Sequence, residues 1–123
     1  MAEATKVGAA RFYRMAEIEP EQMNPLLTRQ FVSGEKLMFA RIMLLKGCVV
    51  PEHSHPNEQI AVILSGALEF VVDGVSQVVR GGEVLVIPAN VRHSATALED
   101  TEDWDLFAPP RQDWLDKDDS YLR

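Results

Sequence analysis

Residues 47–66 read GCVVPEHSHPNEQIAVILSG, and residues 82–97 read GEVLVIPANVRHSATA. The first segment places His53 and His55 two positions apart and Gln59 four positions after His55; the second contains His93, the last of the three histidines. If His53 and His55 lie on one strand, this spacing directs both imidazoles to the same face. Neutral imidazole is a common ligand of first-row transition metals, so the histidines are candidate metal ligands. A His-x-His pair is also common by chance on protein surfaces.

Short apolar runs separated by turn signals surround these two segments. The Asp73-Gly74 pair between two such runs predicts a hairpin, because glycine adopts the positive φ that a tight turn needs. Many short strands at this spacing predict an all-β sandwich or barrel. The expected strands are residues 36–45, 59–64, 67–72, 75–79, 83–87, 91–97 and 103–107, and short helices are expected at 20–23 and 111–115.

Length and composition limit the classes of protein that this chain can represent. One domain spanning residues 1–123 is expected at this length. A net charge of −7, from 12 basic and 19 acidic residues, disfavours binding to nucleic acid. One cysteine excludes an intramolecular disulfide framework, and no apolar run approaches the roughly 20 residues of a membrane span. Residues 1–21 lack the pattern of a secretory signal, so we expect a cytoplasmic protein.

The spacing within residues 47–97 resembles the two motifs of the cupin superfamily. The family pattern is Gly-x5-His-x-His-x3/4-Glu-x6-Gly followed by Gly-x5-Pro-x-Gly-x2-His-x3-Asn. The chain departs from it at Gln59 in place of Glu, Asn90 in place of Gly and Ala97 in place of Asn. Asn also adopts the left-handed conformation, so the change at Asn90 is tolerable. The resemblance implies a single-domain cupin jelly roll, a double-stranded β-helix barrel, with motifs at 47–66 and 82–97.

By position, the resemblance implies one divalent transition metal ion held by His53, His55, Gln59 and His93. Nickel, zinc, iron, cobalt and manganese are all compatible with three imidazoles and an amide. Gln59 leaves the full charge of the ion on the site, which favours anionic or chelating substrates and Lewis-acid chemistry. The alternative is that Gln59 only forms hydrogen bonds inside the barrel while three histidines hold the ion.

The stretch 105–115, DLFAPPRQDWL, is the second informative segment. On a strand, Asp105 and Phe107 share one face, and the two following prolines restrict where Arg111 projects. Arginine is a preferred partner of a substrate carboxylate. Each residue also has a structural interpretation. Asp105 belongs to the acidic tail that starts at Glu99, which is expected to be solvated; Phe107 fits a core, and Arg111 can pair with Asp113.

This pattern is similar to that of the uronate-ketonising cupins of pectin and alginate breakdown. The resemblance implies a metal-dependent, lyase- or isomerase-type enzyme that opens and ketonises 4,5-unsaturated uronate monosaccharides, a small anionic sugar substrate. It assigns Asp105 and Arg111 as catalytic residues. Phe107 and Arg111 are assigned to substrate binding, with Arg111 gripping the substrate carboxylate through two donors.

Other readings of the same motifs remain open. A cupin dioxygenase that uses iron, manganese or nickel with O2 has a similar metal site, and so does a non-catalytic barrel that binds a small molecule. Related single-barrel cupins form homodimers through added N-terminal strands. We therefore expect a homodimer, with residues 9–15 as the candidate strand extension.

Overall fold

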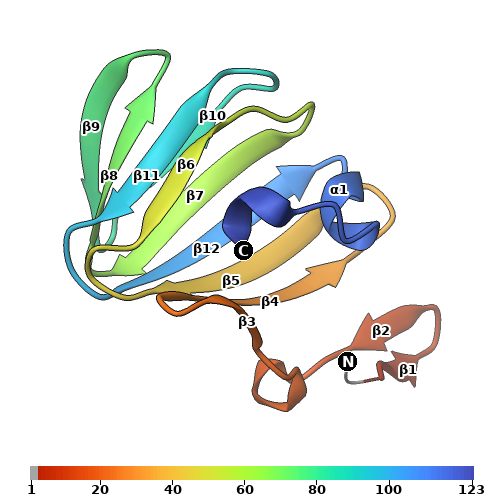
Figure 1. The fold of residues 1–123 in the computed structure, drawn as a ribbon. Helices are drawn as coiled ribbons and strands as arrows, with labels where there is room; N and C mark the ends of the chain where they lie inside the picture. The colour runs from red at the N-terminus through yellow and green to blue at the C-terminus, as the bar shows by residue number, and fades with distance from the viewer. Residues whose placement is uncertain (1–2) are drawn as a thin grey trace.

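Two antiparallel sheets form the body of the molecule in the computed structural model, which describes residues 3–123 (Figure 1). The six-stranded sheet has the order β10 (Val84–Ile87), β7 (Glu58–Ser65), β12 (Thr101–Ala108), β5 (Met38–Leu44), β4 (Leu27–Ser33) and β3 (Glu21–Asn24). The four-stranded sheet has the order β6 (Val49–His53), β11 (His93–Ala97), β8 (Ala67–Val72) and β9 (Val75–Arg80). The expected all-β jelly roll is therefore confirmed, although the two sheets do not close into one continuous barrel.

Helical structure is short, and one expected helix is wrong. The segment 111–115 contains α1 (Gln112–Leu115), as expected, and 3-10 turns occur at η1 (Met15–Glu17) and η2 (Ser120–Leu122). The segment 20–23 instead forms most of β3, which pairs with β4 at the edge of the sheet. A four-residue segment has little helical preference of its own, so pairing with a neighbouring strand decides its conformation.

Two turns show why the sequence carries glycine where it does. Asp73 and Gly74 join β8 to β9 with φ values of 51° and 80°, as the hairpin prediction requires. Gly66 joins β7 to β8 at φ 89°, and a Cβ on it would overlap the backbone oxygen of Asp100. Both the conformation and the space exclude other residues at position 66.

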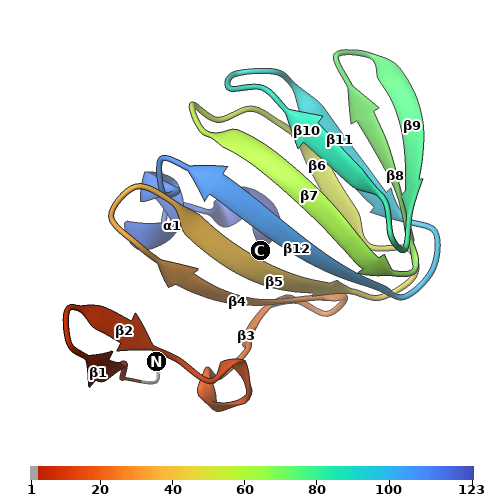
Figure 2. The same cartoon turned by 180° about the vertical axis from the view of Figure 1, so that it is seen from behind.

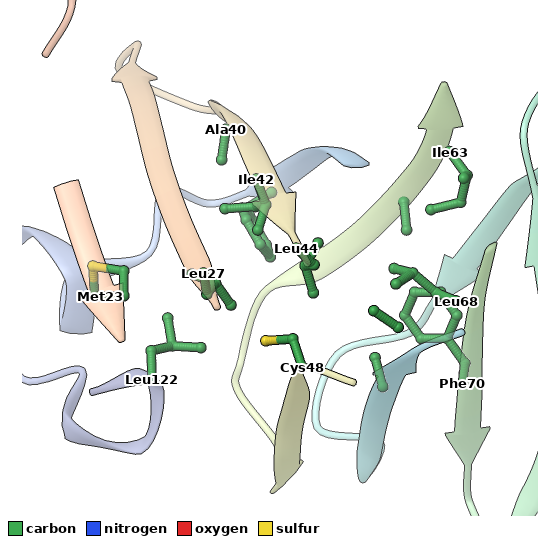
Figure 3. Packing of buried hydrophobic residues seen from close by; sticks show 14 of the residues in the cluster. Met23, Leu27, Ala40, Ile42, Leu44, Cys48, Ile63, Leu68, Phe70 and Leu122 are labelled. Carbon is green, nitrogen blue, oxygen red and sulfur yellow. The ribbon is translucent and has the colours of Figure 1, made fainter. Parts of the chain in front are cut away.

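The core lies between the two sheets. Burial alternates along β5 and β12, because successive side chains of a strand point to opposite faces. Figure 3 shows Ile42 and Leu44 of one sheet and Leu68 and Phe70 of the other directed into the space between them. Burying each large apolar side chain stabilises the fold by about 1.5–3 kcal/mol.

The C-terminal segment, residues 111–123, packs against the sheets instead of forming the solvated acidic tail that we expected. Trp114 and Leu122 are buried, and the Asp119 carboxylate lies 2.8 Å from the buried guanidinium of Arg29 on β4. Asp103 and Asp105 of the same acidic stretch are also buried. Apolar residues interspersed among the acids explain the difference, since their burial draws this segment onto one end of the inter-sheet space (Figure 1).

The N-terminal residues form a separate hairpin of β1 (Thr5–Val7) and β2 (Ala10–Phe12). The expected strand at 9–15 is thus shorter than predicted, and η1 takes its C-terminal end. All six residues of this hairpin are exposed, and the ribbon lies apart from the two sheets (Figure 1). Among residues 3–123, no helix is long and apolar enough to cross a membrane.

Candidate functional site

The three histidines come together at one end of the space between the sheets. His53 ends β6 and His93 begins β11, and the two residues face each other in register within the four-stranded sheet. His93 therefore lies beside His53 and not across the barrel from it. Their ring centroids are 4.3 Å apart, and the His55 ring lies 5.6 Å from His53 and 5.0 Å from His93.

His55 reaches this cluster from a loop and not from a strand. The strand β6 ends at His53, so the two imidazoles do not lie on one strand, and the same-face argument from their spacing does not apply. The chain bends after His53 and returns as β7, which starts at Glu58. The three rings nevertheless each offer a nitrogen within 4.8 Å of the others.

Hydrogen bonds from the histidine rings fix which nitrogen of each faces the cluster. In all three rings Nδ1 lies 2.7–3.0 Å from a backbone carbonyl oxygen, which can only accept, so Nδ1 carries the proton. The accepting carbonyls belong to Pro51, Asn57 and Val91. Each neutral ring then presents an unprotonated Nε2, the arrangement that orients histidines around a metal ion.

Gln59 of β7 connects the histidine cluster to the six-stranded sheet. Its amide nitrogen donates to Asp105 Oδ1 at 3.1 Å, and its Oε1 lies 3.1 Å from His55 Nε2. Because a carboxylate oxygen accepts and cannot donate, Asp105 directs the Gln59 carbonyl oxygen toward the histidines. Asp105 and Gln59 are both buried.

This donor set fits a divalent ion. The Nε2 atom of His93 is buried and has no hydrogen-bond partner among the described residues, an arrangement that is costly unless something binds there. His55 meets oxygen acceptors at both ring nitrogens, which one neutral imidazole cannot satisfy with its single proton. An ion bound by the three Nε2 atoms, with the Gln59 carbonyl oxygen as fourth ligand, resolves both mismatches.

Burial keeps these imidazoles uncharged. Desolvation lowers the pKa of His53 and of His55 to about 4, and it also lowers the pKa of His93. The positive charge of Arg111 lowers the pKa of all three rings further. Protons therefore compete weakly with a metal ion at neutral pH.

A pH dependence of metal binding follows from these pKa values. Metal requires neutral imidazole, so affinity is lost only as the pH falls through the pKa of the free rings. We expect the Kd for Zn²⁺, measured by calorimetry, to change little between pH 7 and pH 5.5 and to rise steeply near pH 4. A steep loss of affinity already at pH 6.5, where exposed histidines titrate, would contradict this environment.

The other predicted residues line a cavity that lies next to the histidines, between the two sheets. Asp105, Phe107 and Arg111 all line it together with His53 and His93. The Phe107 ring is buried, with its centroid 5.7 Å from that of His55, and the Arg111 guanidinium lies 5.0 Å from the Phe107 centroid. The fold therefore brings together all the residues that the sequence singled out.

Arg111 differs from expectation in which N–H groups of its guanidinium are left free to bind a substrate. Its Nε and Nη2 atoms donate to the two carboxylate oxygens of Asp113 at 2.9 and 2.7 Å, and Nη2 also donates to Tyr121 Oη. The structural interpretation, pairing with Asp113, is therefore correct. The two N–H groups without a hydrogen-bond partner among residues 3–123 are both on Nη1, so a bidentate grip from two neighbouring guanidinium nitrogens does not fit this conformation.

Sequence reasoning missed two cavity residues. Asp103 lies two positions before Asp105 on the inner face of β12, so the same alternation that selected Asp105 and Phe107 could have found it. Tyr121 stacks near His53, with ring centroids 4.6 Å apart, and no local pattern announces it. Tyr121 enters the site only because the C-terminal segment folds back over this end of the sheets.

Comparisons with known proteins agree with this geometry. The pectin degradation protein KdgF of Dickeya dadantii is 26% identical over 108 residues, which are 85% of this chain and 98% of that protein. The solved structure of KdgF from Halomonas sp. has a TM-score of 0.79 at 29% identity and covers 84% of this chain and 98% of its own. An RmlC-like cupin from Shewanella frigidimarina has the same TM-score and identity, covering 84% of this chain and 94% of its own. The model of the cupin domain matches residues 40–105, which contain all three histidines and Gln59, and this chain belongs to the cupin family.

Proposed function

We propose that this chain acts in pectin or alginate breakdown by ketonising 4,5-unsaturated uronate monosaccharides. The observation that carries the proposal is the bridge from His55 through Gln59 to Asp105, because it places a buried carboxyl group beside a candidate metal site. The similarity to the two KdgF proteins supports the same reaction class. Phe107 and Arg111 line the same cavity.

The reaction is an isomerisation that needs no co-reactant. The substrate is a cyclic hemiacetal whose ring oxygen belongs to an enol ether conjugated to the carboxylate. Loss of the proton from the C1 hydroxyl forms the C1 aldehyde and breaks the bond from C1 to the ring oxygen. The resulting enolate at C5 takes up that proton at C4 and becomes a ketone, so one proton moves from oxygen to carbon and all atoms are conserved.

In this proposal Asp105 carries the proton. A buried carboxylate can accept it from the C1 hydroxyl and return it at C4. Burial raises the pKa of Asp105, whereas hydrogen bonds from Asp103 and Gln59 lower it. A raised pKa makes the carboxylate a better base than an exposed aspartate.

Arg111 and Phe107 orient the substrate. The free Nη1 of Arg111 can donate to the substrate carboxylate, while Asp113 holds the guanidinium in place through the other donors. Phe107 packs between His55 and Trp114 and restricts water in the cavity. A divalent ion bound by His53, His55, His93 and Gln59 would supply Lewis-acid stabilisation of negative charge.

The test follows the conjugated double bond by its ultraviolet absorbance. An unsaturated galacturonate or mannuronate monomer should lose this absorbance much faster with metal-loaded protein than in the spontaneous reaction. No acceleration with metal confirmed in the protein would overturn the proposal. Oxygen consumption with enol or aromatic substrates would then favour a dioxygenase, and stoichiometric binding without turnover would favour a binding protein.

We also propose that the chain forms a homodimer through the outer face of the six-stranded sheet. In Figure 2 this face is turned to the viewer, and no other described element covers it. Its central charged pair, Arg41 with Glu102, is neutral overall, and the exposed Glu58 lies at the end of β7, so the centre of this face can stack on a second copy about a two-fold axis without charge repulsion. Six apolar side chains on four adjacent strands are at least 36% exposed there: Met43, Leu64, Val84, Val86, Trp104 and Leu106.

A charge placed on this face should prevent the dimer from forming. We expect Leu106→Glu to reduce the mass measured by light scattering from that of two chains to that of one, because a buried unpaired carboxylate is costly. Val75→Glu is the control, since Val75 is exposed on the other sheet. A monomeric wild-type protein, or a dimeric Leu106→Glu variant, would refute this interface.

A further inference from the structure

A second carboxyl group is buried beside the proposed proton carrier. Asp103 and Asp105 lie on the same inner face of β12, and each side chain is 5% exposed. The residues paired with Asp103 on the two neighbouring strands are Ile42 and Ile63, and both are buried. The Oδ1 atom of Asp103 has no hydrogen-bond partner among the described residues.

This placement of Asp103 costs stability, and no hydrogen bond to its Oδ1 from the described residues offsets the cost. A carboxyl group between two isoleucines is desolvated, and a valine of similar shape would fit the same position without that penalty. Features that oppose stability in this way concentrate at functional sites. Asp103 also lines the cavity that contains His53, His93 and Asp105.

Asp103 and Asp105 are two positions apart on β12, and both residues line the same cavity. Two buried carboxylates side by side repel each other, so one of the pair retains a proton. Burial raises the pKa of Asp103 well above its usual range, and the neighbouring Asp105 raises it further. The Gln59 amide already donates to Asp105 Oδ1, which makes Asp105 the acceptor. Asp103, between Ile42 and Ile63, is left as the carboxyl group that keeps the proton and donates it.

We propose that Asp103 is a positioning residue, which donates a hydrogen bond to Asp105 and so holds the Asp105 carboxylate against Gln59 and facing the substrate cavity. Asp105 then receives hydrogen bonds from two sides, from Asp103 and from the Gln59 amide at 3.1 Å. Its orientation is fixed before the substrate arrives, which favours proton transfer. The expected effect on kcat rests on the proposed function. The expected effect on the orientation of the Asp105 carboxylate rests only on the geometry of Asp103 and Asp105.

Two variants of Asp103 separate positioning from a general structural role. Asp103→Val removes the donor, and we expect kcat to fall about 10–100-fold, as for other residues that orient a catalytic group, while KM changes little. The same variant should raise Tm, because an apolar side chain replaces a buried carboxyl group. Asp103→Asn retains a donor, and its kcat should stay within about threefold of wild type.

Thr101→Val is the matched control on the same face of β12. The Thr101 hydroxyl is buried and bonded to the backbone of Ala67 and Glu99, so its removal should lower Tm and leave kcat unchanged. An Asp103→Val variant that keeps the wild-type kcat, whether or not its Tm falls as in this control, overturns the proposal. So does an Asp103→Asn variant as slow as Asp103→Val.

Crystal structures of the two variants keep the inference testable even if the wild-type protein does not ketonise uronates. In Asp103→Asn the contact of 3.1 Å between Gln59 Nε2 and Asp105 Oδ1 should persist, and in Asp103→Val the Asp105 carboxylate should turn away from Gln59. An inactive wild type with this structural response refutes the proposed function but supports the positioning role. An Asp105 carboxylate that stays in place in Asp103→Val refutes the positioning role, whatever the activity.

Discussion

Replacing Asp105 with alanine is expected to lower kcat for the unsaturated uronate by about 10²–10⁴-fold, the usual contribution of a general acid or base. The carboxyl group is buried in the cavity and bonded to Gln59, so no neighbouring water replaces it readily. Asp105→Asn should be as slow as Asp105→Ala, because an amide keeps the shape of the side chain but cannot accept the proton. Absorbance assays at saturating metal measure both variants.

Metal analysis and one surface variant complete this experiment. The three histidines remain in Asp105→Ala, so the protein should still bind one divalent ion when it is saturated with metal. Asp118→Ala removes an exposed carboxylate from the same C-terminal part of the chain and should leave kcat unchanged. If Asp105→Ala turns over at the wild-type rate, Asp105 does not carry the proton.

Replacing His93 with alanine is expected to weaken Zn²⁺ binding by at least about 100-fold, more than the loss of a residue that only orients a ligand. His93 Nε2 is buried and without a partner, and it lies in the cluster whose candidate ligand nitrogens are all within 4.8 Å. Two imidazoles and an amide oxygen are a poor set of ligands for a tightly held ion. Calorimetry gives the Kd, and the absorbance assay should show a parallel loss of turnover.

A matched control distinguishes loss of a ligand from loss of the fold. Gln77 is exposed on β9 of the same sheet, so the Gln77→Ala variant should keep the metal affinity and the activity of the wild type. His93→Ala should keep the circular dichroism of a β protein, because the ring contacts mainly the other site residues. Unchanged Zn²⁺ affinity in a folded His93→Ala protein would mean that the cluster is not a metal site.

Much of this architecture was predictable because it is encoded locally. The alternation of residues along β12 places Asp105 and Phe107 on one face, whatever the rest of the chain does. The turn at Asp73-Gly74 has an equally local cause, since a two-residue hairpin loop itself requires positive φ at both positions. The resemblance of the motif to the cupin pattern singled out the three histidines and Gln59.

The errors arise from contacts with other elements of the fold, which the pattern of a single segment does not describe. Residues 20–23 become a strand because β4 is available for pairing. Tyr121 of the C-terminal segment reaches His53, 68 positions earlier in the chain. Local patterns contain no information about which segment covers the end of the cavity.

The sequence by itself predicted most of the strands and their inward faces, although not β3, β4 or β6, because these follow from periodicity. The resemblance of its motifs to the cupin pattern indicated most of the residues that meet in the site. Tertiary structure alone decided how those residues interact. It brings His55 into the cluster from a loop and turns the Gln59 carbonyl toward it through Asp105. It also places Asp103 between two isoleucines, where desolvation favours the protonated acid. Hydrogen-bond direction and burial depend on neighbours from other strands, and those neighbours exist only in the folded chain.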